Sequence, residues 1–443
     1  MVNNSENVPG NYDMFKYITK SLISLKNYKK LHFAILIMTS RERILSTLNH
    51  TQPDKVPVDL GSATVTGISA IAYNNLKKHL GIYKPTKVFD VVQQLANVDM
   101  EVLDLFGVDV LDINRLSAES DDWYDTDLTD GSKAQFPGWY HPVKDKDGSW
   151  YTIDQDGTIL SKRAEGAAFY DQMYYPYENG YPENLNELNK ALKKISWVVH
   201  SHASNLNASE LRERLIRLKE STGKALVMSG GVKLLELGFF IRRMDNFLMD
   251  LMTDEPKLSE MLDILVDMHL AGLEKKCRTL GDIVEVIRFG DDLGMTSGPF
   301  MDIDTFRKHF KPRYKILCDY VKKNSGMKIF MHSCGSIRQF IPDFIDVGID
   351  ILNPVQTNCH DMDPLSLKKE FGKDIVFWGG GVDTASVLNR ATPEEVRKDV
   401  LNRCEIFSKD GGFVFAPIHN ILSEVPPQNV IAAYNAVKEF NGG

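Results

Sequence analysis

Short apolar runs rich in β-branched residues alternate with longer amphipathic patterns along most of the chain. Apolar runs of four to eight residues are typical of buried strands, whereas apolar residues repeating every three or four positions indicate helices. The pattern predicts strands at 56–60, 108–113, 225–229, 284–289, 328–332, 349–354, 375–378 and 413–416. It predicts helices at 67–80, 205–222, 304–324, 337–346, 393–408 and 427–440.

The alternation of these elements indicates an α/β fold. Strands separated by helices pair in parallel through right-handed crossovers. Eight such units match a (β/α)8 TIM barrel.

One segment, 119–183, departs from the alternation. Two Asp-Gly pairs, Asp147-Gly148 and Asp156-Gly157, favour tight hairpin turns. Trp and Tyr residues are interleaved through the same segment. We expect a small β-rich excursion inserted after the second strand, forming a lid over one end of the barrel. Its aromatic residues either line a substrate or partner surface or simply cover that end.

The start of the organised chain is marked by a helix-capping pattern. Thr39 and Glu42 have the spacing of a capping box, in which each side chain bonds the other's backbone N–H. We therefore divide the chain into an N-terminal extension, 1–37, and a barrel domain, 38–443, which contains the 119–183 lid. The extension is predicted to be dispensable for folding.

Composition narrows the class of protein. Of 443 residues, 43% are hydrophobic and 25% are charged, which are ordinary globular values. The net charge is −8, so the chain has no excess of basic residues that would indicate nucleic-acid binding. No apolar stretch approaches the roughly 20 residues of a membrane-spanning helix. Five cysteines, an odd number, argue against a disulfide framework and favour a reducing cytoplasm.

Polar residues recur where the predicted strands end, and that end of a TIM barrel carries the active site. Five residues that lie at or just after a predicted strand are predicted to bind substrate: Asp59, Asn114, Asn353, Gln356 and Gly380. Arg288, Asp291 and Asp292 are predicted as catalytic residues. Alternatives stay open for them: the aspartates could hydrogen-bond a metal-bound histidine or cap a helix, and Arg288 could pair with Asp291 or with an acidic substrate.

The sharpest motif is His332-Ser333-Cys334, at the end of the fifth strand. Alternate residues of an extended segment point the same way, so the imidazole and the thiol can reach one metal ion. Zinc prefers such nitrogen and sulfur ligands. We predict His419, after the eighth strand, as the third ligand, and Cys359, after the sixth, as the alternative.

Several motifs together resemble the uroporphyrinogen decarboxylase superfamily. They are Thr-Ser-Arg-Glu-Arg from 39, His-Thr-Gln-Pro-Asp-Lys-Val-Pro-Val from 50, Gly-Asp-Asp-Leu-Gly-Met from 290, Met-His-Ser-Cys-Gly-Ser from 331, Gly-Gly-Gly-Val-Asp from 379, Phe-Ala-Pro-Ile-His-Asn-Ile from 415 and Val-Pro-Pro-Gln-Asn-Val from 425. The resemblance runs from about residue 38 to the end. It implies a TIM barrel, and the superfamily contains both decarboxylases and cobalamin-dependent methyltransferases.

The resemblance favours the methyltransferase branch. True uroporphyrinogen decarboxylases carry an arginine-rich stretch after the first strand, but no arginine occurs here between Arg43 and Arg115. The methyltransferases bind zinc through His-x-Cys and a later Cys. His332 and Cys334 match the first two ligands, and His419 stands about where the later Cys would be. Because the decarboxylases also have a histidine near the eighth strand, His419 could instead be a shared barrel residue.

The sequence thus predicts a zinc-dependent methyltransferase. It would move a methyl group between a corrinoid (cobalamin), carried by a separate corrinoid protein, and a small thiol, amine or methoxy substrate. Two alternatives remain: a metal-free decarboxylase, or a non-catalytic barrel that binds a corrinoid or tetrapyrrole. No nucleic acid or membrane partner is expected, and a homodimer is open.

Overall fold

The computed structural model describes residues 38–116, 122–167, 169–195 and 207–443. Its centre is a seven-stranded sheet in which every neighbouring pair is parallel, in the order β15-β14-β13-β12-β11-β10-β3. The strands are β3 Val110–Asp112, β10 Ala225–Ser229, β11 Val286–Gly290, β12 Lys328–His332, β13 Ile351–Asn353, β14 Val376–Trp378 and β15 Phe413–Val414. All seven fall within or beside the predicted runs, which confirms the α/β barrel.

The first predicted strand, 56–60, closes the barrel without forming a regular strand. Val58 makes an isolated parallel bridge to Phe415, beyond the end of β15. The Asp59 N–H donates to the Phe415 carbonyl at 2.8 Å, and the Phe415 N–H donates to the Pro57 carbonyl at 2.8 Å. On the other side, the Asp109 N–H donates to the Val58 carbonyl at 2.8 Å. Pro57 has no N–H, which helps to explain why the pairing stays this short.

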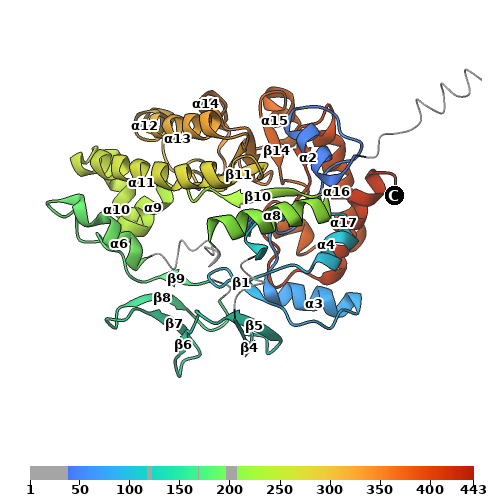
Figure 1. Ribbon diagram of the computed structural model, residues 1–443, viewed down its shortest axis with the longest axis horizontal. Coiled ribbons are helices and arrows are strands. Elements are labelled where there is room, and N and C mark those ends of the chain that lie inside the picture. Colours follow the sequence, from blue (N-terminus) through green and yellow to red (C-terminus); the bar gives the residue numbers. More distant parts are fainter. Residues whose placement is uncertain (1–37, 117–121, 168, 196–206) are drawn as a thin grey trace, which may run out of the picture.

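Helices surround the sheet and supply the crossovers between successive strands (Figure 1). They are α2 Ser40–Leu48, α3 Ala70–Leu80, α4 Met100–Phe106, α6 Leu188–Lys194, α8 Ala208–Thr222, α9 Leu235–Arg242, α10 Met244–Thr253, α11 Pro256–Leu280, α12 Ile303–His309, α13 Lys311–Asn324, α14 Ile341–Val347, α15 Pro364–Phe371, α16 Pro393–Ser408 and α17 Pro427–Phe440. The pattern at 304–324 predicted one helix, but the structure has two, α12 and α13. Pro312, in the first turn of α13, lacks the N–H that a continuous helix would need.

The capping box at the start of α2 is present as predicted. The Glu42 N–H donates to the Thr39 hydroxyl at 3.2 Å, and the Thr39 N–H donates to the Glu42 carboxylate at 2.8 Å. The whole predicted extension, 1–37, lies outside the described residues, as do 117–121 and the start of the helix predicted from 205.

The inserted segment is β-rich, as predicted, and gathers at one side of the molecule (Figure 1). Its antiparallel strands are β4 Trp123–Asp127, β5 Lys133–Pro137, β6 Val143–Lys144, β7 Trp150–Ile153, β8 Ile159–Arg163 and β9 Asp171–Gln172. A separate apolar cluster joins it to the hairpin of β1 Val88–Asp90 and β2 Leu95–Ala96, which the pattern did not predict. Whether the segment works as a lid stays a prediction.

Among the described residues, no helix is both long enough and apolar enough to cross a membrane. All five cysteines are unpaired, so none is held in a disulfide.

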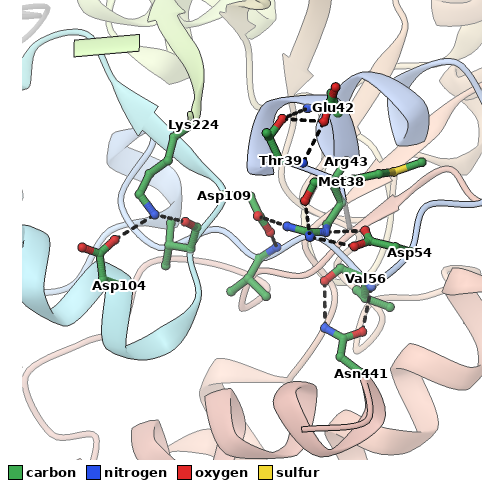
Figure 2. A network of polar contacts seen from close by, with 12 residues as sticks. Met38, Thr39, Glu42, Arg43, Asp54, Val56, Asp104, Asp109, Lys224 and Asn441 are labelled. Atoms are coloured by element: carbon green, nitrogen blue, oxygen red, sulfur yellow. Dashed lines mark hydrogen bonds and ion pairs between the residues drawn. The ribbon is translucent and has the colours of Figure 1, made fainter. Parts of the chain in front are cut away.

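Hydrogen bonds and ion pairs from side chains hold the closing segment, 56–60, in place (Figure 2). The Asn441 side chain accepts from the Val56 N–H at 2.8 Å and donates to its carbonyl at 3.1 Å. Arg43 donates to Asp54 at 2.7 Å and to Asp109 at 2.6 Å, and Asp109 also accepts the Val58 N–H at 2.9 Å. One buried ion-pair cluster therefore ties α2 and the closing segment to β3.

We predict that Arg43→Met lowers the free energy of unfolding by about 3–5 kcal/mol, because it leaves Asp109 buried without its counter-charge. Urea unfolding followed by circular dichroism measures this. Arg397→Met is the matched control, since Arg397 pairs with Glu439 at an exposed site and its loss should cost under about 1 kcal/mol. An equal effect of the two substitutions would contradict the role given to Arg43.

Candidate metal centre

Three side chains that can bind a metal converge at the carboxyl ends of the barrel strands. His332 ends β12, Cys334 follows it by two residues, and His419 lies in the loop after β15. Their ligand atoms all lie within 4.8 Å of one another. The Cys334 Sγ is 3.4 Å from the His332 Nε2, and the two imidazole rings are 5.8 Å apart between centroids. The structure therefore brings together the three residues that the sequence predicted as metal ligands.

The neighbours of His332 determine which ring nitrogen is free. The Asn353 side-chain N–H donates to the Trp378 carbonyl at 2.8 Å, which turns the Asn353 oxygen toward His332. That oxygen lies 2.6 Å from the His332 Nδ1, so Nδ1 carries the proton and donates it. The lone pair is then on Nε2, the nitrogen that faces Cys334. Such an outer hydrogen bond fixes the tautomer and orientation of a metal-binding histidine.

His419 is oriented in the same way by a different amide. The Asn420 side-chain N–H donates to the Gln93 side-chain oxygen at 2.9 Å, and the Asn420 oxygen lies 2.8 Å from the His419 Nδ1. The His419 Nε2 is therefore also the nitrogen with the free lone pair. Gln93 lies between β1 and β2, so the unpredicted hairpin contributes to the site.

The backbone of the loop that carries Cys334 is held by side chains from the loops after the two neighbouring strands. Asp292, after β11, accepts the Cys334 N–H at 2.9 Å, and Gln356, after β13, accepts the Gly335 N–H at 2.7 Å. The Asp292 carboxylate is also 3.5 Å from the His332 Nε2. Two residues predicted as catalytic or substrate-binding thus support the Cys334 loop, and Asp292 also borders the metal centre itself.

Burial shifts the ionisation of both central ligands. It lowers the pKa of His332 to about 3, with a further contribution from His419, so the imidazole is neutral at physiological pH. Burial, followed by the nearby Asp292, raises the pKa of the Cys334 thiol well above its usual range. Without a cation the thiol stays protonated, whereas a bound zinc ion stabilises the thiolate. Neutral imidazole nitrogens and a buried thiol form a donor set that fits zinc.

Several of the predicted site residues are buried, and Asp291 and Asp59 are fully enclosed. Asp291 accepts the N–H groups of Leu234 at 2.5 Å, Leu235 at 3.1 Å and Glu236 at 2.8 Å, so it caps α9. Asp59 is fully buried and accepts from the Trp378 indole N–H at 2.8 Å. The capping alternative therefore describes Asp291. Asp59 is bonded within the protein, and its role toward a substrate stays a prediction.

Close packing against Val355 explains why a glycine occupies position 380, which was predicted to bind substrate. Gly380 has a φ of +80°, and a Cβ there would lie 2.8 Å from the Val355 Cβ. Asn114 lies near the mouth, where its N–H donates to Asp112 at 2.9 Å, and its substrate role stays a prediction. Cys359 is buried and lies outside the three-residue cluster, so the geometry favours His419 as third ligand.

Three residues important to this centre were not singled out from the sequence. Gln93 and Asn420 orient His419, and Glu236, on α9, contributes its negative charge to the surroundings of His332, Arg288 and Asp291. Asn420 could have been found as the polar neighbour of a strand-end histidine. Gln93 and Glu236 reach the mouth only through the packing of elements distant in sequence, so no local signal marks them.

Comparison with protein-family models gives one match. The model for uroporphyrinogen decarboxylase (URO-D) matches residues 237–440, slightly less than half of the chain. The resemblance to the uroporphyrinogen decarboxylase superfamily is confirmed. The matched segment contains Asp292, His332, Cys334 and His419, so the candidate centre lies inside the part that resembles the superfamily. None of the curated proteins matches the chain significantly.

Solved structures extend the likeness of the fold. A methyltransferase from Methanosarcina mazei gives a TM-score of 0.55 at 18% identity, over 91% of this chain and 99% of that one. An endo-1,4-beta-xylanase from Caldicellulosiruptor owensensis gives a TM-score of 0.31 at 11% identity, over 53% of this chain and 84% of that one. At such identity, the first match shows only that the two chains share a fold over nearly their whole length.

We predict that His332 and His419 both carry their proton on Nδ1 in the metal-free protein at neutral pH. Histidine 15N chemical shifts distinguish the two tautomers. His332 should remain uncharged down to about pH 5, where an unshifted imidazole is mostly protonated. Asn353→Leu should release His332 from this tautomer and leave His419 unchanged. Protonation of His332 on Nε2 in the wild type would contradict the orientation described.

Proposed function

We propose that this protein is a zinc-dependent methyltransferase that exchanges a methyl group between a corrinoid on a separate protein and a small thiol, amine or methoxy substrate. The observation that carries the proposal is the cluster of two imidazoles and one thiol at the barrel mouth, with one ligand atom of each residue within 4.8 Å of the others. Three protein ligands with one open position are typical of catalytic zinc. The reducing cytoplasm expected from the cysteines would keep Cys334 available.

The donor set fits zinc better than a magnesium or calcium ion, because those ions prefer oxygen ligands. His332, Cys334 and His419 would hold the ion, and Asn353 and Asn420 would keep the two imidazoles turned toward it. When bound, zinc supplies Lewis acidity, which stabilises a thiolate or polarises the heteroatom of a methylated substrate.

Asp292 has the position of an acid–base group in this reaction. Its carboxylate is 3.5 Å from the His332 Nε2 and its side chain is 38% exposed, so it borders both the centre and the open mouth. With a thiol acceptor, Asp292 would take the thiol proton as the sulfur becomes nucleophilic. With a methylated donor, it would return a proton to the heteroatom that loses the methyl group.

The methyltransferase branch draws support from two further observations. The neighbour that covers nearly the whole chain is described as a methyltransferase, although the identity of 18% shows only the fold. A metal-free decarboxylase would use Asp291 or Asp292, and Asp291 is committed to capping α9. The corrinoid is proposed to arrive on a partner protein. An Asp-x-His-x-x-Gly pattern occurs at 267–272, but it lies within α11, where His269 is buried with its Nε2 2.8 Å from the Lys233 carbonyl.

We predict about one zinc ion per chain in protein purified without chelators, measured by elemental analysis. Cys334→Ala should abolish zinc binding and methyl transfer while the fold persists, and His419→Ala should weaken zinc binding by a factor of ten or more. Cys359→Ala is the matched control and should retain the metal. Active wild-type protein without metal would contradict the proposal and favour a decarboxylase. Loss of zinc in Cys359→Ala alone would identify the wrong third ligand.

We predict that Asp292→Asn retains zinc but lowers the rate of methyl transfer by 10²–10⁴-fold, the usual contribution of a general acid–base group. Methylcobalamin absorbance follows the transfer. The amide still accepts the Cys334 N–H, so the loop should keep its position. An unchanged rate in a zinc-loaded variant would remove Asp292 from the mechanism.

A further inference from the structure

The two histidines of the candidate centre are oriented by amides that are themselves held in different ways. The Asn353 N–H donates to the Trp378 carbonyl, a backbone group at the end of β14. The Asn420 N–H donates instead to a side-chain oxygen, that of Gln93, at 2.9 Å. A strand-end carbonyl is fixed by the sheet, whereas a side chain moves with the element that carries it. One histidine is therefore fixed by the barrel, and the other, His419, by the β1–β2 hairpin.

The direction in which the Asn420 amide faces determines the tautomer of His419. Because its N–H group is bonded to Gln93, the Asn420 oxygen faces the His419 Nδ1 at 2.8 Å and accepts its proton. An amide turned the other way would present an N–H group to Nδ1, and the proton would then be carried on Nε2. A histidine protonated on Nε2 cannot offer that nitrogen to a metal ion. Gln93 therefore controls whether Nε2 of His419 is available.

The hairpin that carries Gln93 lies between the barrel and the inserted segment (Figure 1). On the barrel side, the Gln94 carbonyl accepts the N–H of Ala70, the first residue of α3, at 2.8 Å. On the other side, the Val92 carbonyl accepts the N–H of Tyr170, in the inserted segment, at 3.3 Å. Both sequence neighbours of Gln93 are thus bonded, one to each part of the molecule.

Apolar packing also ties the hairpin to the inserted segment. Val88 and Val91 share a buried cluster with Phe136 of β5, and this cluster is distinct from the larger one that fills the barrel. The Gln135 N–H donates to the Thr86 carbonyl, just before β1, at 2.8 Å. The position of the hairpin is therefore set by the inserted segment as well as by the barrel.

We propose that the inserted segment determines whether His419 is available as a metal ligand, with Gln93 as the positioning residue that links the two. The outer hydrogen bonds of metal-binding histidines contribute about 10–100-fold to metal affinity. A shift of the hairpin would release Asn420, whereas His332 would keep its tautomer because the Trp378 carbonyl holds its amide partner. The inference rests on the proposed function only in taking His419 as a metal ligand.

Histidine 15N chemical shifts of the metal-free protein test the link between Gln93 and His419. In Gln93→Leu, we expect His419 to lose its uniform protonation on Nδ1, while His332 stays as in the wild type. Gln93→Glu restores an oxygen that accepts from Asn420, so it should return His419 to the wild-type tautomer. An unchanged His419 in Gln93→Leu, or an equal change in both variants, would overturn the proposal.

Zinc affinity, measured by competition with a chromophoric chelator, tests the link to the inserted segment. We expect Gln93→Leu to weaken zinc binding at least about tenfold. Phe136→Ala, which removes a buried ring from the shared cluster and touches no residue of the centre, should weaken it in the same direction. Leu160→Ala is the matched control, because Leu160 is buried on β8 outside that cluster, and it should keep the wild-type affinity. Equal affinities in the Phe136 and Leu160 variants would overturn the role of the inserted segment.

Methyl transfer is followed on the same preparations to separate this inference from the proposed function. Zinc-loaded, active protein whose affinity is unchanged in Gln93→Leu contradicts only the positioning role. Protein that binds no zinc, but in which the His419 tautomer depends on Gln93, supports the positioning of His419 and contradicts the zinc-dependent function.

Discussion

Closure of the barrel by residues 57–59 is the constraint on which the site depends. This segment joins β15 to β3 through three backbone hydrogen bonds and is held from below by Arg43, Asp109 and Asn441. Because the sheet closes, the loop after β15 lies across the mouth from the end of β12, which places His419 beside His332. In an open sheet of the same strand order, those two strand ends would lie far apart.

A series of buried hydrogen bonds also links the closing segment to the candidate metal centre. Asp59 accepts the Trp378 indole N–H, the Trp378 carbonyl accepts from Asn353, and the Asn353 oxygen accepts from His332. Each of the polar groups in this series of hydrogen bonds has a partner, as a rigid buried network requires. Asp59 thus influences the site indirectly. It holds Trp378, whose carbonyl orients Asn353, and Asn353 in turn orients His332.

Much of the fold could be predicted because its elements leave local signals. Strands buried on both faces are continuous apolar runs, and seven of them appear in register in the sheet. His332 and Cys334 could be predicted as a pair because i and i+2 share a face at a strand end. His419 followed from the closed topology together with the family resemblance.

The remainder depends on contacts between distant elements. Asp291 and Asp292 are adjacent and chemically identical, yet one caps α9 and the other borders the metal centre. The 88–96 hairpin is short and polar in part, so it has little periodicity, and its Gln93 reaches Asn420 across 327 positions. No sequence pattern distinguishes the roles of these residues, because each role depends on how the side chain is buried and oriented in the fold.

Zinc K-edge X-ray absorption of the purified protein tests the central claim most directly, since it counts the atoms bound to the ion. The account predicts one sulfur at about 2.3 Å and two imidazole nitrogens at about 2.0–2.1 Å, with one further light atom. The sulfur should disappear in Cys334→Ala and persist in Cys359→Ala. Two sulfurs in the wild type, or a shell of oxygen and nitrogen alone, would contradict a centre built from His332, Cys334 and His419.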